Sequence, residues 1–341
     1  MDNLAEIKTD AKQFLAEKFA LSKLIGNNQL FVEAIRRAVK IAQISAPVLL
    51  LGETGTGKEL FARAIHHLSS RSNEPYIAVN CAAIPFELFE NELFGHVKGA
   101  YTDARQQQKG YIAEAEGGTL FLDEINSLHP TVQVKLLRFL QDQEYKPLGE
   151  SKTIKADVRI IAASNMNLLN PNVNTDFRRD LLYRLDVFSI RIPPLRDRRN
   201  DIPELVNHFL EKYCQKYNLP KKIIAKSAMS KLMSYDWPGN IRELENAIHK
   251  CVVLSAESVI QENQIEIPLK YEIIDRNKKS TSFSIIKTEL INNFERNYIT
   301  NLLFDCDGNI SKAVKLARMD RKNFYRLMKK YKINREEICR H

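Results

Sequence analysis

The stretch GETGTGKE, from Gly52 to Glu59, sets a lysine among glycines directly after an apolar run. Glycines let backbone N–H groups point inward around phosphate oxygens, and a helix that begins here adds its positive end. Lys58 can then reach the outer phosphates of a nucleotide, whereas Glu59 stands where such loops usually have a Ser or Thr for Mg²⁺. The predicted phosphate-binding residues are Gly52, Glu53, Thr54, Gly55, Thr56, Gly57, Lys58 and Glu59.

A second stretch, GGTLFLDEI, is an apolar run that ends in two carboxylates, Asp123 and Glu124. Asp123 can hold Mg²⁺ through water, and Glu124 can orient and deprotonate the water that attacks a phosphate. The alternative is a solvated strand end or a helix cap, but the phosphate-binding loop upstream favours the catalytic interpretation. Together the two stretches predict ATP hydrolysis, with ATP and Mg²⁺ as cofactors.

These residues need a scaffold that brings strand ends together. Strands that alternate with helical stretches imply a parallel, doubly wound sheet of the α/β class. After PPLRDRR the pattern turns wholly helical through about Pro268, which predicts a smaller helical lid subdomain. The five β-rich runs are Val48 to Leu51, Tyr76 to Val79, Thr119 to Leu122, Val158 to Ala163, and Val187 to Ile192.

The predicted domain boundaries follow from these shifts in pattern. Residues 1–22 read as an amphipathic helix that serves as a linker or a dimer contact. Residues 23–195 form the α/β nucleotide-binding subdomain and 196–268 the lid. Polar residues 269–283 form a linker, and 284–341 form a helical C-terminal domain.

Composition and charge narrow the class of protein. With 44% apolar and 27% charged residues in 341, the chain can bury a core, which excludes global disorder. No apolar run is long enough for a membrane span and no leader is visible, so we expect a soluble, cytoplasmic protein. From Gly308 onward the chain has eleven basic and only three acidic residues, so most of the net charge of +9 belongs to this C-terminal segment. This asymmetry favours a polyanion partner over a merely solvated basic face.

From Leu24 to about Pro268 the chain resembles the central domain of bacterial enhancer-binding proteins, the sigma-54-dependent transcription activators of the AAA+ class. That family also carries Glu after the phosphate-loop lysine, as Glu59 does here. Eight blocks fall in the family's order and spacing: LIG, GETGTGKE, NCAA, ELFGH, GGTLFLDEI, FRRDLLYRL, PPLRDRR and WPGNIRELEN.

The resemblance implies roles for polar residues around the nucleotide. Asn165 would sense the γ-phosphate, and Asn80 would hold Glu124 away from water until the nucleotide is engaged. Ile25 and Arg242 would contact the nucleotide of their own subunit, although Arg242 can also be an ordinary exposed lid arginine.

Two further arginines, Arg178 and Arg184, would reach the nucleotide of the neighbouring subunit. The alternative for each is a surface salt bridge. A site completed by a neighbour's arginine implies self-assembly, from a dimer to a hexameric ring.

The resemblance also implies a partner loop, in which the family has GAFTGA and this chain has GAYTDA. In the family the loop tip presses on sigma-54 as ATP turns over. Tyr101 keeps an aromatic ring for contact, whereas Asp103 replaces a glycine and adds charge. We favour a sigma-54-directed activator over an ATPase of this type that acts on another target. The loop residues are Gly99, Ala100, Tyr101, Thr102, Asp103 and Ala104.

The C-terminal stretch GNISKAVKLARMDRKNFYRLMKKYKI resembles a Fis-type helix-turn-helix for double-stranded DNA. Asn309 or Ser311 can cap a first helix, and Asp320 can cap a second one. Arg318 stands where the family turn commonly has glycine, so it is costly if its φ must be positive. The alternative is a basic hairpin without DNA function. Phe324, Leu327 and Met328 would anchor the second helix in the core of the domain. The predicted base contacts are Arg321, Lys322 and Asn323, and Tyr325 is also available to DNA. The predicted phosphate contacts are Arg326, Lys329 and Lys330.

The favoured function is an ATP-driven activator that binds DNA upstream of promoters and remodels the sigma-54 RNA polymerase holoenzyme. One alternative is a DNA-binding AAA+ regulator or repressor that acts without sigma-54, and another is a remodeller of a different assembly. We see no receiver or sensory domain before Leu24, so a regulatory protein in trans or a truncation is expected.

Overall fold

The computed structural model divides the chain into two compact units, Met1–Ile267 and Pro268–His341. The predicted helix 1–22, linker 269–283 and loop residues Tyr101–Ala104 lie outside the described part of the chain. The described residues are 24–100, 106–165, 168, 176–267, 291–292, 295–296, 298–300, 302–303, 306, 309–331 and 333.

The first unit is built on a five-stranded parallel sheet, as the sequence predicts. Its strand order is β2-β3-β6-β1-β7, so the central strand β6 lies between β3 and β1. Strands β1, β3 and β6 are buried over almost their whole length, and their central residues are apolar, because helices cover both faces of the sheet. The strands span Val48–Leu51 (β1), Tyr76–Asn80 (β2), Thr119–Asp123 (β3), Arg159–Ser164 (β6) and Phe188–Arg191 (β7).

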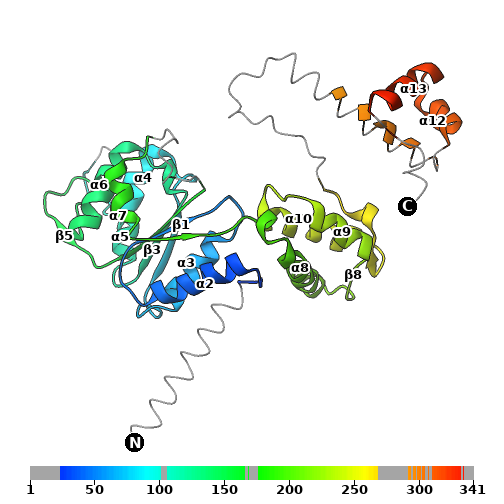
Figure 1. The fold of residues 1–341 in the computed structure, drawn as a ribbon. Helices are drawn as coiled ribbons and strands as arrows, with labels where there is room; N and C mark the ends of the chain where they lie inside the picture. The colour runs from blue at the N-terminus through cyan, green and yellow to red at the C-terminus, as the bar shows by residue number, and fades with distance from the viewer. Residues whose placement is uncertain are drawn as a thin grey trace, which may run out of the picture. The chain divides into compact units, whose positions relative to one another are not determined.

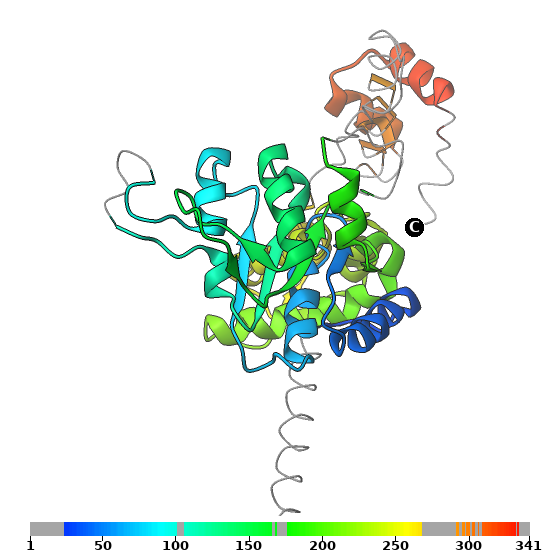
Figure 2. The ribbon, with the colours of Figure 1, turned by 90° about the vertical axis from the view of Figure 1, so that its left-hand side faces the viewer.

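Two layers of helices cover the sheet. Alternation along β1 directs Val48 and Leu50 into one core and Leu49 and Leu51 into the other. Figures 1 and 2 show α2 and α3 on one side of the sheet and α4 and α6 on the other. The helices span Gln29–Ala42 (α2), Lys58–His67 (α3), Phe86–Phe94 (α4), Tyr111–Glu114 (α5), Pro130–Asp142 (α6) and Arg179–Leu185 (α7).

The predicted partner loop leaves this body through a hydrogen-bonded stem. His96 and Gln108 exchange two backbone bonds of 3.0 Å, and Leu148 bonds to the backbone of Gly95 at 2.8 Å. A side chain on Gly110 would begin 2.4 Å from the backbone nitrogen of Gly95, so only glycine fits at this crossing. The hairpin of β4 (Glu144–Tyr145) and β5 (Ile154–Lys155) beside the stem was not expected from the sequence.

The lid has its own core around the fully buried Trp237. The prediction of an all-helical segment needs one correction, because β8 (Ile223–Ile224) pairs in parallel with β9 (Val259–Ile260). Two-residue strands are too short to show an alternating pattern in the sequence. The other elements are η2 (Leu195–Asp201), α8 (Ile202–Lys216), α9 (Lys226–Ser234), α10 (Asn240–Leu254) and η3 (Glu262–Gln264).

The second unit contains α12 (Ile310–Ala317) and α13 (Arg321–Lys330). Asn309 caps α12 by accepting the N–H of Lys312, and Asp320 caps α13 by accepting two N–H groups. Arg318 ends α12 with φ of 50°, so this position does require the left-handed conformation. Phe324, Leu327 and Met328 are buried, as predicted.

Candidate active site

The phosphate loop joins β1 to α3 at the carboxyl edge of the sheet. Gly57 precedes α3 with φ of 98°, a conformation that favours glycine. The side chain of Lys58 is buried, and its Nζ donates to the backbone carbonyls of Gly52 (2.8 Å) and Glu53 (3.1 Å). Glu59 is paired with Arg63 one turn later, at 2.8 Å. The backbone of the loop therefore surrounds the ammonium group of Lys58 and holds it in place.

The two predicted catalytic carboxylates lie close enough to this lysine for their charges to act on it. Burial lowers the pKa of Lys58, while the negative charges of Asp123 and Glu124 oppose that effect. The backbone N–H of Glu124 donates to Asp123 Oδ1 at 2.9 Å, and Glu124 itself has a left-handed backbone with φ of 53°. Such a conformation costs about 1–2 kcal/mol for a non-glycine residue. The structure thus brings Lys58, Asp123 and Glu124 together at one edge of the sheet.

The two predicted asparagines lie at neighbouring strand ends. Asn80 is in register with Asp123 across β2 and β3, and its Oδ1 accepts the backbone N–H of Ala82 at 2.9 Å. Asn165 is exposed and follows β6 directly. The preceding Ser164 accepts the backbone N–H of Gly52 at 3.2 Å. Both asparagines therefore belong to the strand edge that carries the phosphate loop.

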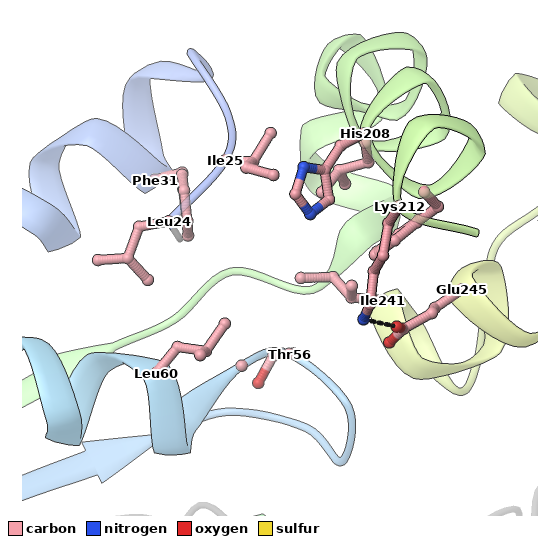
Figure 3. Close-up of a pocket in the computed structure, with 12 residues that line it drawn as sticks. Leu24, Ile25, Phe31, Thr56, Leu60, His208, Lys212, Ile241 and Glu245 are labelled. Atoms are coloured by element: carbon pink, nitrogen blue, oxygen red, sulfur yellow. Dashed lines mark hydrogen bonds and ion pairs between the residues drawn. The ribbon is translucent and has the colours of Figure 1, made fainter. Parts of the chain in front are cut away.

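A pocket of about 520 Å³ opens between the phosphate loop and the lid. Figure 3 shows Leu24, Ile25 and Phe31 on one side, facing His208 and Lys212 of α8. Thr56, Leu60 and Ile241 complete the apolar part, and Lys212 Nζ bonds to Glu245 Oε1 at 2.7 Å. Small-molecule pockets are typically concave and mostly apolar, with few polar groups, so this one suits the apolar part of a small ligand.

Arg242 lies close to the same loop, on the exposed side of α10. Its Cβ is 3.2 Å from the point at which a side chain on Gly55 would begin. Its positive charge is one of the influences that lower the pKa of Lys58, after burial. The structure therefore places Arg242 beside the nucleotide-binding loop of its own chain.

Arg178 and Arg184 lie at the two ends of α7. The Arg178 side chain forms an ion pair of 2.8 Å with Asp180 and is 45% exposed. Arg184 is exposed, and its Nε donates to the carbonyl of Leu140 at 3.3 Å. Both guanidinium groups are thus engaged on α6 and α7 while staying accessible to another molecule.

The sequence did not single out three further residues that contact the phosphate loop: Arg196, Arg198 and Asn240. Two of them lie in PPLRDRR and one in WPGN, blocks that the resemblance covers. A polar residue within such a block was the signal in the sequence that could have indicated a site residue. The sequence does not show that each of these residues contacts the phosphate loop, which lies more than 140 positions away.

Comparisons with known proteins decide the family. The Sigma-54 interaction domain family matches residues 24–191, and the AAA+ ATPase lid domain family matches residues 196–282. Transcriptional regulatory protein GlrR of Escherichia coli (strain K12) is 40% identical over 315 residues, which is 92% of this chain and 69% of GlrR. The chain belongs to the family of sigma-54-dependent transcriptional regulators.

Two other relatives agree with this family. Sigma54-dependent transcriptional regulator SfnR of Pseudomonas fluorescens (strain Pf0-1) is 50% identical over 228 residues, 67% of this chain and 62% of SfnR. The crystal structure of NtrX from Brucella abortus in complex with ATP matches with a TM-score of 0.67 and 30% identity, covering 97% of this chain and 75% of NtrX. The resemblance stated from the sequence is confirmed, and the chain carries the family's AAA+ ATPase domain.

Proposed function

We propose that this chain hydrolyses ATP to remodel the sigma-54 RNA polymerase holoenzyme, and that its C-terminal unit binds DNA upstream of promoters. The observation that carries the proposal is the meeting of Lys58 with Asp123 and Glu124 in a sigma-54 interaction domain. Such a regulator would act in the cytoplasm, where DNA and polymerase are.

The positions of the site residues support the roles that the resemblance implies. The base of ATP would occupy the 520 Å³ pocket beside Ile25, and the phosphates would follow the loop to Lys58. Glu124 would accept a proton from the water that attacks the γ-phosphorus, as the bond to the bridging oxygen breaks and ADP leaves. Asn165 would sense the γ-phosphate, and Asn80 would hold Glu124 away from water until ATP is engaged.

Asp123 is the residue that would hold Mg²⁺. Among the described residues, no group of three or more His, Cys, Asp or Glu side chains could hold a metal ion by itself. Mg²⁺ usually needs only one or two carboxylates together with substrate phosphates, so a single aspartate beside the phosphate loop fits. When bound, the ion would spread the negative charge that develops on the phosphates.

The exposed arginines of α7 would complete the site of a neighbouring subunit in a ring. Arg178 and Arg184 are accessible, and their present partners are a surface carboxylate and a backbone carbonyl. Exchange of such partners for a phosphate costs little, because exposed ion pairs contribute only about 0–1 kcal/mol. An arginine supplied in trans can raise the rate by about 10³–10⁵.

The second unit would bind DNA through α13. Tyr325 is 45% exposed on this helix, and Arg326 Nη2 donates to Asn323 Oδ1 at 2.8 Å. Lys330 is already paired with Glu295 at 3.0 Å, so we expect a weaker phosphate contact from it. Arg321 and Lys322 are exposed in the first turn, where base contacts are usual.

The proposal is tested at the partner loop. Tyr101→Ala should keep ATP hydrolysis, assembly and DNA binding, yet lose sigma-54 capture in the presence of a transition-state mimic of ATP. Tyr101→Phe serves as the matched control and should be nearly silent, while Asp103→Gly should equal or exceed the parent in open-complex formation. If Tyr101→Ala still forms open complexes as the parent does, the alternative of a regulator that works without sigma-54 becomes the better account.

A further inference from the structure

The phosphate loop is attached to other parts of the first unit along five consecutive residues, Gly52 to Thr56. Each of these residues forms a hydrogen bond to a group outside the loop. Gly52 donates its N–H to the carbonyl of Ser164, and the Glu53 carboxylate accepts from the side chains of Arg196 and Asn240. The carbonyl of Thr54 accepts from the side chain of Asn240, that of Gly55 from the N–H of Ile241, and that of Thr56 from the side chain of Arg198. Four of the five attachments come from η2 or α10, so the loop and the lid are joined directly.

The shortest of these bonds join Glu53 to Arg196. Arg196 Nη2 lies 2.6 Å from Glu53 Oε1, and Nη1 lies 2.8 Å from Oε2. Two parallel charge-assisted bonds of this kind fix orientation as well as distance. Hydrogen bonding to Arg196 also holds the pKa of Glu53 below its ordinary value, so the carboxylate stays ionised. Each side chain keeps 40% exposure, so solvent screens part of the interaction.

Asn240 connects this pair to the lid. Its Nδ2 donates to Glu53 Oε2 (3.2 Å) and to the carbonyl of Thr54 (3.0 Å), while its Oδ1 accepts the N–H of Leu195 at 2.8 Å. The residue is fully buried and begins α10. A side chain on Gly55 would begin 2.2 Å from the carbonyl oxygen of Gly239, so the two turns approach as closely as glycine allows.

Glu53 presents an electrostatic difficulty, because it puts a negative charge in a loop that receives the phosphates of ATP. Its charge is close enough to act on Lys58. An unneutralised carboxylate there would repel ATP and compete for the lysine. Arg196 supplies the opposite charge at contact distance, from an element that also begins the lid.

We propose that Arg196 is a positioning residue of the ATPase site: it neutralises Glu53 and fixes it against Asn240, so that the phosphate loop keeps its charge balance and its attachment to the lid. The inference rests on the proposed function, since it assumes that ATP binds at this loop. It assigns roles to Glu53, Arg196 and Asn240 that the resemblance did not supply.

The experiment measures ATP affinity by calorimetry and steady-state ATPase kinetics on the full chain. Arg196→Ala should weaken ATP binding by about tenfold, the scale expected for one uncompensated charge beside a partly solvated anion site. Adding Glu53→Gln should restore most of the loss, because the uncompensated charge is removed. A merely structural arginine predicts the opposite, since the double variant would then be at least as weak as the single one. Arg196→Lys keeps the charge without the two-point bond and should lie between Arg196→Ala and the parent.

Arg199→Ala is the matched control. Arg199 lies three residues later on η2, and its guanidinium contacts Asp236 and the carbonyls of Ser234, Met233 and Arg196. Its removal deletes the same charge from the same element and should leave ATP affinity within about twofold.

Thermal unfolding of every variant shows whether it folds. If Arg196→Ala does not fold, Arg196→Gln takes its place, alone and combined with Glu53→Gln, and the same loss and recovery are expected. Parental ATP affinity in the Arg196 variant, or no recovery in the double variant, overturns the inference. ATP binding by the parent chain is measured first. If the parent binds no ATP, the proposed function is overturned together with this inference, whereas a parent that binds ATP leaves only the inference to be tested by the variants.

Discussion

The carboxylate of Asp201 accepts a hydrogen bond of 2.9 Å from the backbone N–H of Asn28, 173 positions earlier in the chain. The same oxygen accepts the N–H of Asn27 at 2.8 Å, and Asn28 caps α2. Asp201 also lies beside the fully buried Arg198, whose pKa is lowered to about 10 by burial, an effect that Asp201 opposes. One carboxylate therefore fixes the segment that begins the base pocket.

Asp201→Ala should lower the free energy of unfolding by about 3 kcal/mol, because two partly buried N–H groups lose their acceptor and the buried Arg198 loses its counter-charge. ATP affinity should fall as well, since Leu24 and Ile25 lose their anchor. Urea unfolding and calorimetry check this. Asp197→Ala, at an exposed position of the same element, should cost no more than about 0.5 kcal/mol. A loss below about 1 kcal/mol for Asp201→Ala would contradict the assignment.

Lys58→Ala and Glu124→Ala should fail in different ways. Lys58→Ala removes the cation that holds the phosphates and should lose ATP binding. Glu124→Ala should bind ATP and trap the ring, with kcat lower by about 10²–10⁴. Nucleotide binding and turnover measured in parallel separate the two. Equal ATP affinity in both variants, with turnover intact in either, would refute these roles.

Arg184 is expected to act on the neighbouring subunit. Mixing Arg184→Ala subunits with Glu124→Ala subunits should recover part of the ATPase activity, because some interfaces then pair an intact arginine with an intact carboxylate. Activity is measured across mixing ratios, with subunit exchange confirmed by labelled chains. If mixed rings form and no ratio recovers activity, Arg184 does not act in trans.

Arg318 carries a backbone conformation that suits glycine. Arg318→Gly should stabilise α12 and α13 by about 0.5–1 kcal/mol, because relief of the left-handed strain outweighs the entropy that glycine adds to the unfolded chain. Hydrogen-exchange protection of amides in both helices measures it. Lys315→Gly, at an exposed position inside α12, should lower protection instead. The same sign for both variants would contradict the strain argument.

Salt dependence tests the phosphate contacts of α13. Replacing Arg326 and Lys329 with alanine should flatten the slope of log affinity against log salt by about two contacts, at about 0.9 per phosphate. Lys330→Ala should change the slope less, because Glu295 already neutralises that lysine. A slope that stays at the parental value in the double variant would remove both residues from the interface.

The sheet and the phosphate loop could be predicted because their signals are local. Strands β1 and β6 are continuous apolar runs, and Gly52–Glu59 follows the first of them directly. Asn309, rather than Ser311, caps α12, a choice that the sequence left open. The sequence indicated that Arg318 would be costly if its φ had to be positive, and the structure shows that its φ is positive.

The attachments between loop and lid could not be predicted. The bond from Glu53 to Arg196 joins positions 143 apart, and neither residue type indicates its partner. Asn240 is fully buried, whereas asparagine is usually exposed. The β8–β9 pair depends on backbone hydrogen bonds between two-residue segments, which leave no periodic signal.

The stem formed by Gly95, His96, Gln108, Gly110 and Leu148 has a consequence for how such a protein can diversify. The hydrogen bonds that join its strands are between backbone groups, and its crossing point depends on the absence of side chains at two glycines. The closure of the stem is therefore set by residues that lie outside positions 101 to 104. The proposed partner loop can therefore vary in sequence while the ATPase fold beneath it keeps its stability, so the choice of partner and the hydrolysis of ATP can evolve separately.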